Sequence, residues 1–373
     1  MKSSPLVEKF FPCSRCGASL RYSVKSGTLK CPYCGFENRI EEVDADLREY
    51  DFKEAVEVLE KIRPKPLKRR DVKCPSCGAV FKMEENVFSG TCPYCGVFVV
   101  ENVRDYRPIF AQGLLPFTVD RKKAFLIFKK WIDSLWFAPS DLKKAKFELN
   151  FIGYYLPYWT FDADTETYYE GRRGDYYFEY ETFLVNVDGR LQRRSERVQK
   201  IRWRRVNGRV FRHFDDVIVG ASKRLSRKIV DALAPWPIER AVAYDEKYLT
   251  GFEGELYQID LKDGFEVAKL YMNQVIRSDV LRDIGGDRQE ILYLTTSYKN
   301  RTFKHLLLPV WVADFKYGGK NYRFAINAVT GKLRGERPYS KIKIFFAVLF
   351  SLILLSILFY LANEYGYIFE GNF

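Results

Sequence analysis

The stretch Cys13-Ser-Arg-Cys16, followed after fourteen residues by Cys31-Pro-Tyr-Cys34, decides the fold of the N-terminal part of this chain. The pattern returns 61 residues later in Cys74-Pro-Ser-Cys77 and Cys92-Pro-Tyr-Cys95. Each Cys-x2-Cys knuckle presents two thiolates, and two knuckles complete a tetrahedron around a metal ion. We therefore predict two zinc ribbons, each with one structural Zn²⁺. The predicted ligands are Cys13, Cys16, Cys31, Cys34, Cys74, Cys77, Cys92 and Cys95.

A glycine follows the second cysteine of every knuckle, where positive φ lets the backbone turn and aim its amides at the thiolates. These glycines are Gly17, Gly35, Gly78 and Gly96. The alternatives to zinc are disulfide bonds and iron–sulfur clusters. The duplicated spacing and the lack of a signal peptide argue against disulfides, and the two isolated sets of four disfavour clusters.

The C-terminal part contains nineteen consecutive uncharged residues, 344–362, which is close to the length needed to cross a hydrocarbon core of about 30 Å. Ser351 and Ser356 can bond back to carbonyls within such a helix. Basic residues precede the run and acidic residues follow it, so the positive-inside rule keeps the large N-terminal part in the cytoplasm. We predict a tail-anchored protein with a short extracytoplasmic tail at 363–373. The alternative is a buried core helix.

The composition restricts the function classes. Hydrophobic residues make up 47% of the chain and aromatic residues 16%, which excludes extensive disorder. The formal net charge is +13, but residues 1–100 carry 17 Lys and Arg against 14 Asp and Glu. Loaded tetrathiolate sites remove more positive charge, so the ribbons are nearly neutral. Zinc ribbons that bind nucleic-acid phosphates are normally basic. The near-neutral charge of these two ribbons therefore disfavours nucleic-acid binding but does not exclude it.

Periodicity and turn signals divide the chain into an α+β protein with an antiparallel-sheet-rich body. We expect zinc ribbon 1 at 8–40, a helix and basic linker at 41–70, zinc ribbon 2 at 71–103, the α+β body at 104–340 and a transmembrane helix at 344–362. Helices are expected at 42–62, 121–136 (capped by Asp120), 222–234 and 263–284 (capped by Asp263). Strands are expected at 154–166, 291–297, 303–317 and 322–328, with hairpin turns at Asp188-Gly189, Asn207-Gly208 and Gly318-Gly319.

The body contains two similar sequence motifs. Leu156-Pro-Tyr-Trp159 resembles Leu308-Pro-Val-Trp311, and each enters a strand that becomes acidic and aromatic. We infer that residues 104–340 contain two related halves. Proline early in a strand suits an edge strand or a first position.

Residues 190–212 hold ten basic side chains and one acidic one. On a strand, Lys200, Arg202 and Arg204 share one face, and Arg209 follows. This face could contact a nucleic-acid backbone or anionic lipid headgroups. The alternative is neutralisation by acidic residues of a neighbouring strand, such as Asp164, and we favour this alternative.

Evidence for an enzyme is weak. Asp215-Asp216 and the segment 282–287 are compact enough for a metal or catalytic loop, but no other feature supports that role. The two histidines, His213 and His305, are far apart in sequence, and there is no P-loop, nucleophile elbow or His-Glu-x2-His helix. All the cysteines are assigned to zinc. No small-molecule substrate is evident.

Several long motifs resemble a widespread bacterial family of zinc-ribbon proteins of unknown function. They include Leu156-Pro-Tyr-Trp-Thr-Phe-Asp-Ala-Asp164, Arg172-Arg-Gly-Asp-Tyr-Tyr177, Phe214-Asp-Asp-Val217, Asp283-Ile-Gly-Gly-Asp287, Phe303-Lys-His-Leu-Leu-Leu-Pro-Val-Trp311 and Gly335-Glu-Arg-Pro338. The resemblance covers residues 70–343. Members are often labelled TFIIB-type zinc-ribbon or primosomal helicase-like proteins, but the nucleotide-binding motif is absent and we expect no helicase activity. The resemblance implies a bacterial protein, here in the inner (cytoplasmic) membrane.

Two functional classes follow. The first is a membrane-tethered, cytoplasm-facing binding or scaffold protein with structural zinc, which binds an unidentified protein partner. The second is a membrane-associated nucleic-acid-binding protein that uses the basic strands at 190–212. An enzyme of unrecognised mechanism is the remaining alternative.

Overall fold

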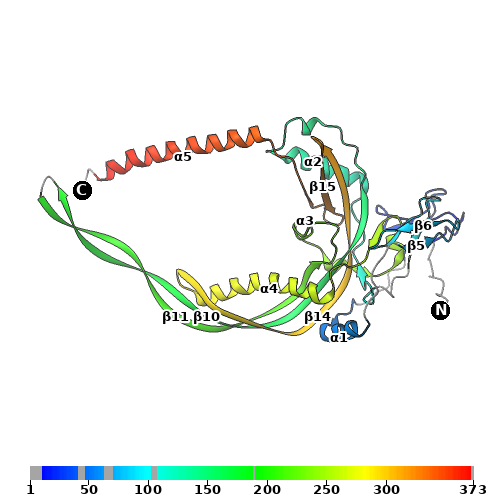
Figure 1. Ribbon diagram of the computed structural model, residues 1–373, viewed down its shortest axis with the longest axis horizontal. Helices are drawn as coiled ribbons and strands as arrows, with labels where there is room; N and C mark the ends of the chain where they lie inside the picture. Colours follow the sequence, from blue (N-terminus) through cyan, green and yellow to red (C-terminus); the bar gives the residue numbers. More distant parts are fainter. Residues whose placement is uncertain (1–10, 41–46, 63–69, 102–106, 188–189, 371–373) are drawn as a thin grey trace.

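The computed structural model describes the chain except for residues 1–10, 41–46, 63–69, 102–106, 188–189 and 371–373. Within the described residues it is an α+β protein with five α-helices and two four-cysteine clusters, as predicted (Figure 1). Most of the expected basic linker, residues 42–46 of the helix expected at 42–62 and the Asp188-Gly189 turn lie outside the described residues. The helix prediction is wrong for residues 47–51, because the helix begins at Phe52 and Tyr50–Asp51 form a strand.

Ribbon 1 is a three-stranded antiparallel sheet that packs on the body. Its strands are β1 (Arg21–Ser23), β2 (Thr28–Lys30) and β3 (Glu37–Asn38). The backbone N–H of Tyr22 donates to the carbonyl oxygen of Thr250 at 3.1 Å. The Tyr22 ring lies 5.4 Å from that of Tyr248 and 6.3 Å from that of Phe252. The interior of ribbon 1 is therefore continuous with the largest hydrophobic core of the body.

Ribbon 2 is joined to the body through the main sheet. It comprises β5 (Arg70–Lys73), β6 (Val80–Met83), β7 (Val87–Thr91) and β8 (Phe98–Val100). Strand β7 pairs with β13 (Glu253–Glu255), which pairs in turn with a central strand. The backbone N–H of Gly254 also donates to Ser89 Oγ at 2.6 Å. Both ribbons are thus fixed to the body rather than carried on free linkers.

Four long strands dominate the main sheet. These are β10 (Ile152–Val187), β11 (Arg190–Gly220), β14 (Arg288–Tyr317) and β15 (Lys320–Asn327). Strands β10 and β14 are antiparallel neighbours at its centre, with β11 beside β10 and β15 beside β14. The short strands β4 (Tyr50–Asp51), β9 (Gly113–Leu114), β12 (Val242–Ala243) and β16 (Leu333–Gly335) complete it.

Helices cover parts of this sheet. They are α1 (Phe52–Ile62), α2 (Arg121–Ser134), α3 (Arg227–Ala232), α4 (Leu261–Ile284) and α5 (Lys341–Glu370), with 3-10 turns η1 (Leu142–Lys144), η2 (Ile238–Arg240) and η3 (Glu246–Leu249). Asp120 caps α2 as predicted, since its side chain accepts from the backbone N–H of Lys123 at 2.8 Å. The prediction for α4 was wrong by one turn, because its N-cap is Asp260 and Asp263 lies inside the helix. Helix α3 is also shorter than the expected 222–234.

The pair β10–β11 forms a long twisted ribbon that projects far from the body, beyond the end of α4 (Figure 1). The predicted hairpin at Asn207-Gly208 is wrong: β11 runs straight through it, and Gly208 lies opposite Tyr169 of β10. A Cβ at Gly208 would lie 2.6 Å from the Tyr169 hydroxyl oxygen, so glycine serves close packing here and not a turn. Val187 pairs with Arg190, as expected for the predicted hairpin around 188–189.

The two strands expected at 291–297 and 303–317 are one continuous strand, β14. The polar residues between them form an irregularity inside the strand, where Asn300 has φ of 47° and the register against β10 shifts between Asp162 and Asp164. Asn300 Nδ2 donates to Asp164 Oδ2 at 2.8 Å. A bulge within a strand and a loop between strands give the same polar interruption in sequence.

The two Leu-Pro-x-Trp segments are adjacent in space, because Leu156 of β10 lies opposite Leu308 of β14. The expectation that their prolines occupy an edge or a first position was wrong. Pro157 lies in β10 between its pairing with β13 and its pairing with β11, and Pro309 lies in β14 between its pairing with β9 and its pairing with β15. A proline is tolerated where one partner strand replaces another. Two related halves within 104–340 stay a prediction.

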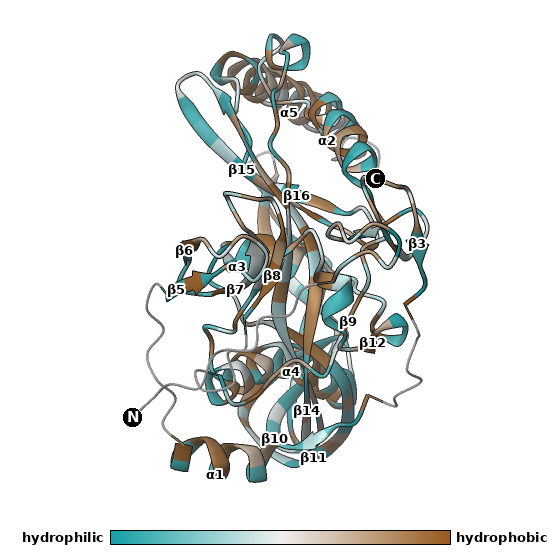
Figure 2. Ribbon diagram, turned by 90° about the vertical axis from the view of Figure 1, so that its right-hand side faces the viewer, coloured by the Kyte–Doolittle hydropathy of each residue, from teal (hydrophilic) through white to brown (hydrophobic). Residues whose placement is uncertain are grey.

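Helix α5 leaves the body as an isolated apolar rod (Figure 1). Over Lys341–Leu361 its mean hydropathy is 2.8 and none of the window is buried, so its length and composition suffice to cross a membrane. Ser351 Oγ and Ser356 Oγ donate to the carbonyl oxygens of Ala347 and Leu352, as predicted. The helix leaves from the end of the molecule that carries α2 (Figure 2).

Candidate metal centres

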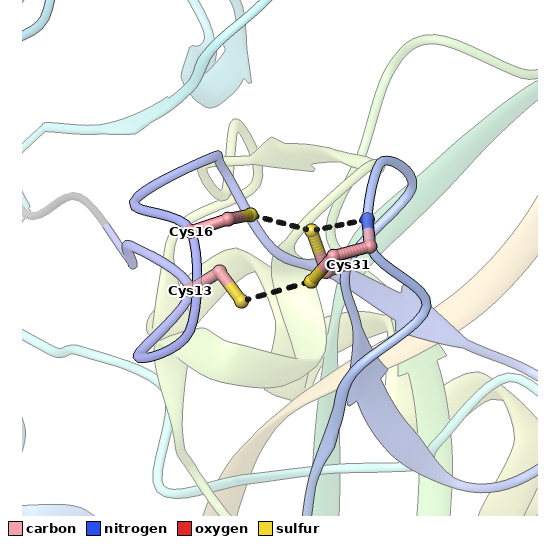
Figure 3. Close-up of side chains that lie close together, drawn as sticks. Cys13, Cys16 and Cys31 are labelled. Atoms are coloured by element: carbon pink, nitrogen blue, oxygen red, sulfur yellow. Dashed lines mark hydrogen bonds between the residues drawn. The ribbon is translucent and has the colours of Figure 1, made fainter.

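The eight cysteines form two clusters, and within each cluster the four Sγ atoms lie within 4.8 Å of one another. In ribbon 1 the Cys13–Cys34 and Cys16–Cys31 Sγ distances are 3.7 and 3.5 Å, and three of these side chains converge in Figure 3. In ribbon 2 the Cys74–Cys95 and Cys77–Cys92 distances are 3.5 and 3.9 Å. Tetrahedral thiolates with metal–sulfur bonds near 2.3 Å lie about 3.8 Å apart, whereas bonded sulfurs lie about 2 Å apart. The cysteines are free thiols with the spacing of a metal site.

The four knuckles share one backbone geometry. In each, the glycine N–H donates to the carbonyl oxygen of the first cysteine, at 2.8–3.1 Å. The glycines Gly17, Gly35, Gly78 and Gly96 have φ of 74°, 71°, 72° and 73°. The Cys34 N–H also points at Cys31 Sγ at 3.5 Å, and this contact lowers the pKa of the Cys31 thiol. Backbone amides directed at sulfur favour the thiolate, which is the form that binds metal.

Burial divides the ligands in the same way in both ribbons. The first cysteine of each knuckle is buried, and Cys74 and Cys92 belong to a small core of ribbon 2 together with Val72, Met83 and Val99. The second cysteine is exposed or half-buried. Four thiolates close the coordination sphere and leave no position for a reacting water, so each cluster can hold a metal ion in a structural role.

The residues predicted for anion contact lie on β11, and three of the four contact acidic residues of β10 diagonally across the strand pair. Lys200 Nζ lies 2.9 Å from Glu179 and 2.5 Å from Glu181. Arg204 lies 3.7 Å from Asp175, and Arg209 lies 3.3 Å from Glu166. Arg202 has no acidic partner among the described residues, and its guanidinium lies 4.9 Å from the Tyr177 ring. Cross-strand pairing thus engages three of the four residues, and their role in anion contact stays a prediction.

Towards its tip the strand pair β10–β11 exposes arginines and apolar side chains. Arg193 and Arg194 have no ion pair among the described residues, and Arg197 stacks on Phe178 at 3.7 Å. Exposed hydrophobic side chains accompany them: Tyr176, Phe178, Tyr180, Phe183, Leu184, Leu191, Ile201 and Trp203. No helix covers this part of the ribbon (Figure 1).

The predicted acidic loop at Asp215-Asp216 belongs to a cluster that the sequence did not reveal. Asp215 lies with Glu49 and the buried Asp162, with carboxylate oxygens within 4.8 Å of one another. Burial raises the pKa of Asp162 to about 6, and the neighbouring Glu49 adds to the shift. Lys304 contacts Asp216 at 2.9 Å and Glu49 at 3.1 Å. This lysine supplies the countercharge, so the cluster already has a structural explanation: it holds the segment before α1 against β14.

The segment 282–287 is likewise structural. Asp283 accepts from the Tyr169 hydroxyl at 2.5 Å, and Asp287 accepts from the backbone N–H of Tyr176 at 2.6 Å. Gly285 and Gly286, with φ of 63° and 77°, provide the turn from α4 into β14. The motif therefore fixes α4 to the base of the ribbon.

The two histidines occupy different environments. His305 is buried between the rings of Trp159 and Tyr257, and burial lowers its pKa to about 4. His213 is exposed, and its hydrogen bond to Asp164 at 2.7 Å raises its pKa. The structure does not bring them together in a catalytic arrangement.

One surface feature was missed in the sequence. Tyr33 and Tyr94 occupy the same position in the Cys-Pro-Tyr-Cys knuckles of the two ribbons, and they are 82% and 71% exposed. An aromatic side chain repeated at an exposed position is typical of a contact surface. The duplicated Cys-Pro-Tyr-Cys was the available signal, but it was interpreted only as a metal knuckle.

Comparison with known proteins gives one relative. Over 344 residues the chain is 23% identical to a protein of Bacillus subtilis (strain 168) named "Uncharacterized protein YdjG", covering 90% of this chain and 91% of that protein. No protein-family model matches the sequence, and no solved structure is similar to it. The similarity extends over nearly all of both chains, but the relative's name specifies no activity.

Proposed function

We propose that this protein is a membrane-anchored scaffold whose two four-cysteine clusters bind structural Zn²⁺ and whose ribbons present a docking surface to a protein partner in the cytoplasm. The observation that carries the proposal is the attachment of both ribbons to one body that ends in an exposed apolar helix. This arrangement joins both four-cysteine clusters to one body that carries a single candidate membrane helix.

Zinc is the metal that best suits the clusters. Four thiolates in tetrahedral spacing select Zn²⁺ or an iron–sulfur centre. Each cluster has four sulfur ligands and belongs to a small sheet, which is the arrangement of structural zinc sites. Zinc has no redox chemistry, so we assign the metal the role of holding the knuckles in place.

The charges that flank α5 favour a cytoplasmic location of the zinc ribbons. Arg334, Arg337, Lys341 and Lys343 precede the apolar window of α5, and Glu364 and Glu370 follow it. Basic residues are retained on the cytoplasmic side of a span. The relative from Bacillus subtilis supports a bacterial origin.

Exposed aromatic side chains on the ribbons support a protein partner. Tyr33 and Tyr94 project at equivalent positions, and Phe36 and Val80 are exposed on the same two ribbons. Tyrosine at an exposed position with a rigid backbone contributes strongly to protein interfaces, because few rotamers are lost on binding.

The metal and membrane parts are tested on the full-length chain isolated from its membranes. We expect two zinc ions per chain by elemental analysis, and retention in the membrane fraction after alkaline extraction. Removal of residues 341–373 should release a chain that still holds two zinc ions. Iron in place of zinc, or extraction of the full-length chain at alkaline pH, contradicts the corresponding part.

A second candidate is nucleic-acid binding by the ribbon β10–β11. It is supported by the unpaired Arg193 and Arg194 together with the exposed aromatic side chains near the tip. Stacking aromatics beside arginines suit single-stranded nucleic acid, and the affinity would fall steeply with salt as counterions are released. The cross-strand ion pairs of Lys200, Arg204 and Arg209 make it the second choice.

A further inference from the structure

The loop that follows α2 is attached to the start of α5, although about 200 residues separate them in sequence. The backbone N–H of Ser340 donates to the carbonyl oxygen of Phe137 at 2.8 Å. Lys343 Nζ donates to the carbonyl oxygen of Ala138 at 2.7 Å. The 135–138 loop therefore lies at the level where α5 leaves the body.

This loop presents large aromatic side chains to the surroundings. Trp136 is 79% exposed and Phe137 is 40% exposed, while Leu135 before them and Ala138 after them are buried and anchor the loop. Tyr339, just before α5, is 54% exposed. Tryptophan and tyrosine concentrate at the level of lipid headgroups, where an apolar ring and a polar edge are both accommodated.

Basic side chains lie close to the loop. Lys341 is exposed in the first turn of α5, and η1 carries the exposed Lys143 and Lys144. Lys143 Nζ donates to the carbonyl oxygen of Asp133 at the end of α2, which places η1 beside the loop. Of the nearby acids, Asp141 already accepts from the Tyr317 hydroxyl at 2.7 Å. Such a surface complements anionic lipid headgroups.

The direction in which the strand pair β10–β11 projects restricts how α5 can be oriented in a membrane. In Figure 1 α5 and the ribbon β10–β11 leave the body in the same direction. The arginines and the open edge of β11 cannot enter hydrocarbon. The proposed membrane attachment therefore requires that α5 in a bilayer point away from the strand pair β10–β11, with its first turn still bonded to the 135–138 loop. The 135–138 loop, bonded to that turn, is then the part of the body that faces the membrane.

We propose that the 135–138 loop is a second membrane contact, with Trp136 and Phe137 inserted among the upper acyl chains and the neighbouring lysines at anionic headgroups. This inference rests on the proposed membrane attachment through α5. Its consequence is a fixed orientation of the body on the bilayer, which a single helix on a short connection does not provide.

Tryptophan quenching tests the insertion. The full-length chain is placed in nanodiscs of phosphatidylcholine and phosphatidylglycerol, with acyl chains brominated near the headgroup or left unmodified. We expect the brominated lipid to quench part of the wild-type emission. Trp136→Tyr should lose most of this quenching. Trp203→Tyr is the matched control, because Trp203 is also exposed (41%) but lies on the ribbon, and it should retain the quenching.

The outcomes separate the two proposals. A chain that does not co-elute with nanodiscs overturns the membrane attachment, and the inference with it. A chain that co-elutes but shows the same quenching in wild type and Trp136→Tyr overturns the inference alone. Loss of quenching in Trp203→Tyr instead assigns the membrane contact to the ribbon and also overturns the inference.

Discussion

Trp159 and Trp311 make the same hydrogen bond in the two parts of the body. Trp159 Nε1 donates to the carbonyl oxygen of Ile259 at 2.9 Å, and Trp311 Nε1 donates to that of Val119 at 2.7 Å. Each acceptor immediately precedes an N-cap aspartate, Asp260 of α4 or Asp120 of α2. Each central strand thus fixes the start of one helix. The similarity between the two Leu-Pro-x-Trp segments therefore includes the hydrogen bond that each tryptophan makes.

Removal of either indole donor should destabilise the body by a similar amount. In Trp159→Phe and Trp311→Phe a buried carbonyl oxygen loses its partner, which costs about 1–3 kcal/mol, in addition to lost packing. Chemical denaturation of the chain without residues 341–373 measures the free energy of unfolding. The control is Trp203→Phe on the exposed ribbon, which should change it little. Unequal losses, with one variant near wild type, would contradict the matched role.

The two metal sites should be lost independently. Cys74→Ser should reduce the zinc content from two ions to one and make ribbon 2 sensitive to protease, because Cys74 and Cys92 belong to its small core. Cys13→Ser should do the same to ribbon 1. The matched controls are Ser76→Ala and Ser14→Ala, exposed residues within the same knuckles, which should keep both ions. Retention of two ions in Cys74→Ser would show that the ligand assignment is wrong.

Acid should destabilise the body partly through His305. Burial lowers the pKa of His305 to about 4, below the unfolded value near 6.5. The unfolded chain therefore binds more protons in this window, and this contribution to stability is lost as the pH falls from about 6.5 to 4. The contribution is on the order of 3 kcal/mol. Asp162 acts oppositely, since its pKa is raised to about 6 and its contribution is lost as the pH rises through that value.

Comparison of variants isolates the histidine. The slope of unfolding free energy against pH should be less positive in His305→Gln than in wild type between pH 4 and 6.5. His213→Gln should change the slope with the opposite sign mainly above about pH 6.5, because the hydrogen bond to Asp164 raises the pKa of His213 and stabilises the folded chain at low pH. A slope in His305→Gln equal to that of wild type would refute the buried-histidine explanation.

Reversal of two basic charges on β11 should not reduce capture of the protein partner. In Arg202→Glu/Arg204→Glu the fold should persist, because both side chains are exposed and exposed ion pairs contribute about 0–1 kcal/mol. Partner capture in nuclease-treated extracts, normalised to the amount of chain recovered, measures the effect. If the double variant no longer captures the partner, the basic face of β11 is functional. That result would contradict docking of the partner on the zinc ribbons.

The sequence predicted those features that depend on local chemistry. The cysteine spacing, the Asp120 cap and the Gly318-Gly319 turn were correct because each is set by a few adjacent residues. The turn predicted at Asn207-Gly208 was wrong, because a dipeptide that favours a turn also fits a crowded position within a strand. Only the contact with the distant Tyr169 distinguishes a turn from a strand here. The polar interruption at Asn300 is likewise a bulge only because Asp164 lies opposite it.

The surroundings of the candidate site were less predictable for the same reason. Docking of ribbon 1 depends on Thr250 and Phe252, more than 200 residues from Tyr22. The cluster of Glu49, Asp162 and Asp215 joins three distant segments, and nothing in their local sequences indicates that they meet. The sequence predicted that acidic residues of a neighbouring strand neutralise the basic segment, but it did not identify them. Lys200 pairs with Glu179 and Glu181, and Arg204 pairs with Asp175.

Site-specific photo-crosslinking in living cells tests the central claim most directly. A photoreactive phenylalanine derivative replaces Tyr33, Tyr94 or, for comparison, Tyr180 on the ribbon β10–β11, and membranes are analysed with and without nuclease. We predict that Tyr33 and Tyr94 positions yield the same protein adduct, resistant to nuclease, while Tyr180 does not. Adducts that form only at Tyr180 and disappear with nuclease would contradict the scaffold account and establish nucleic acid as the ligand.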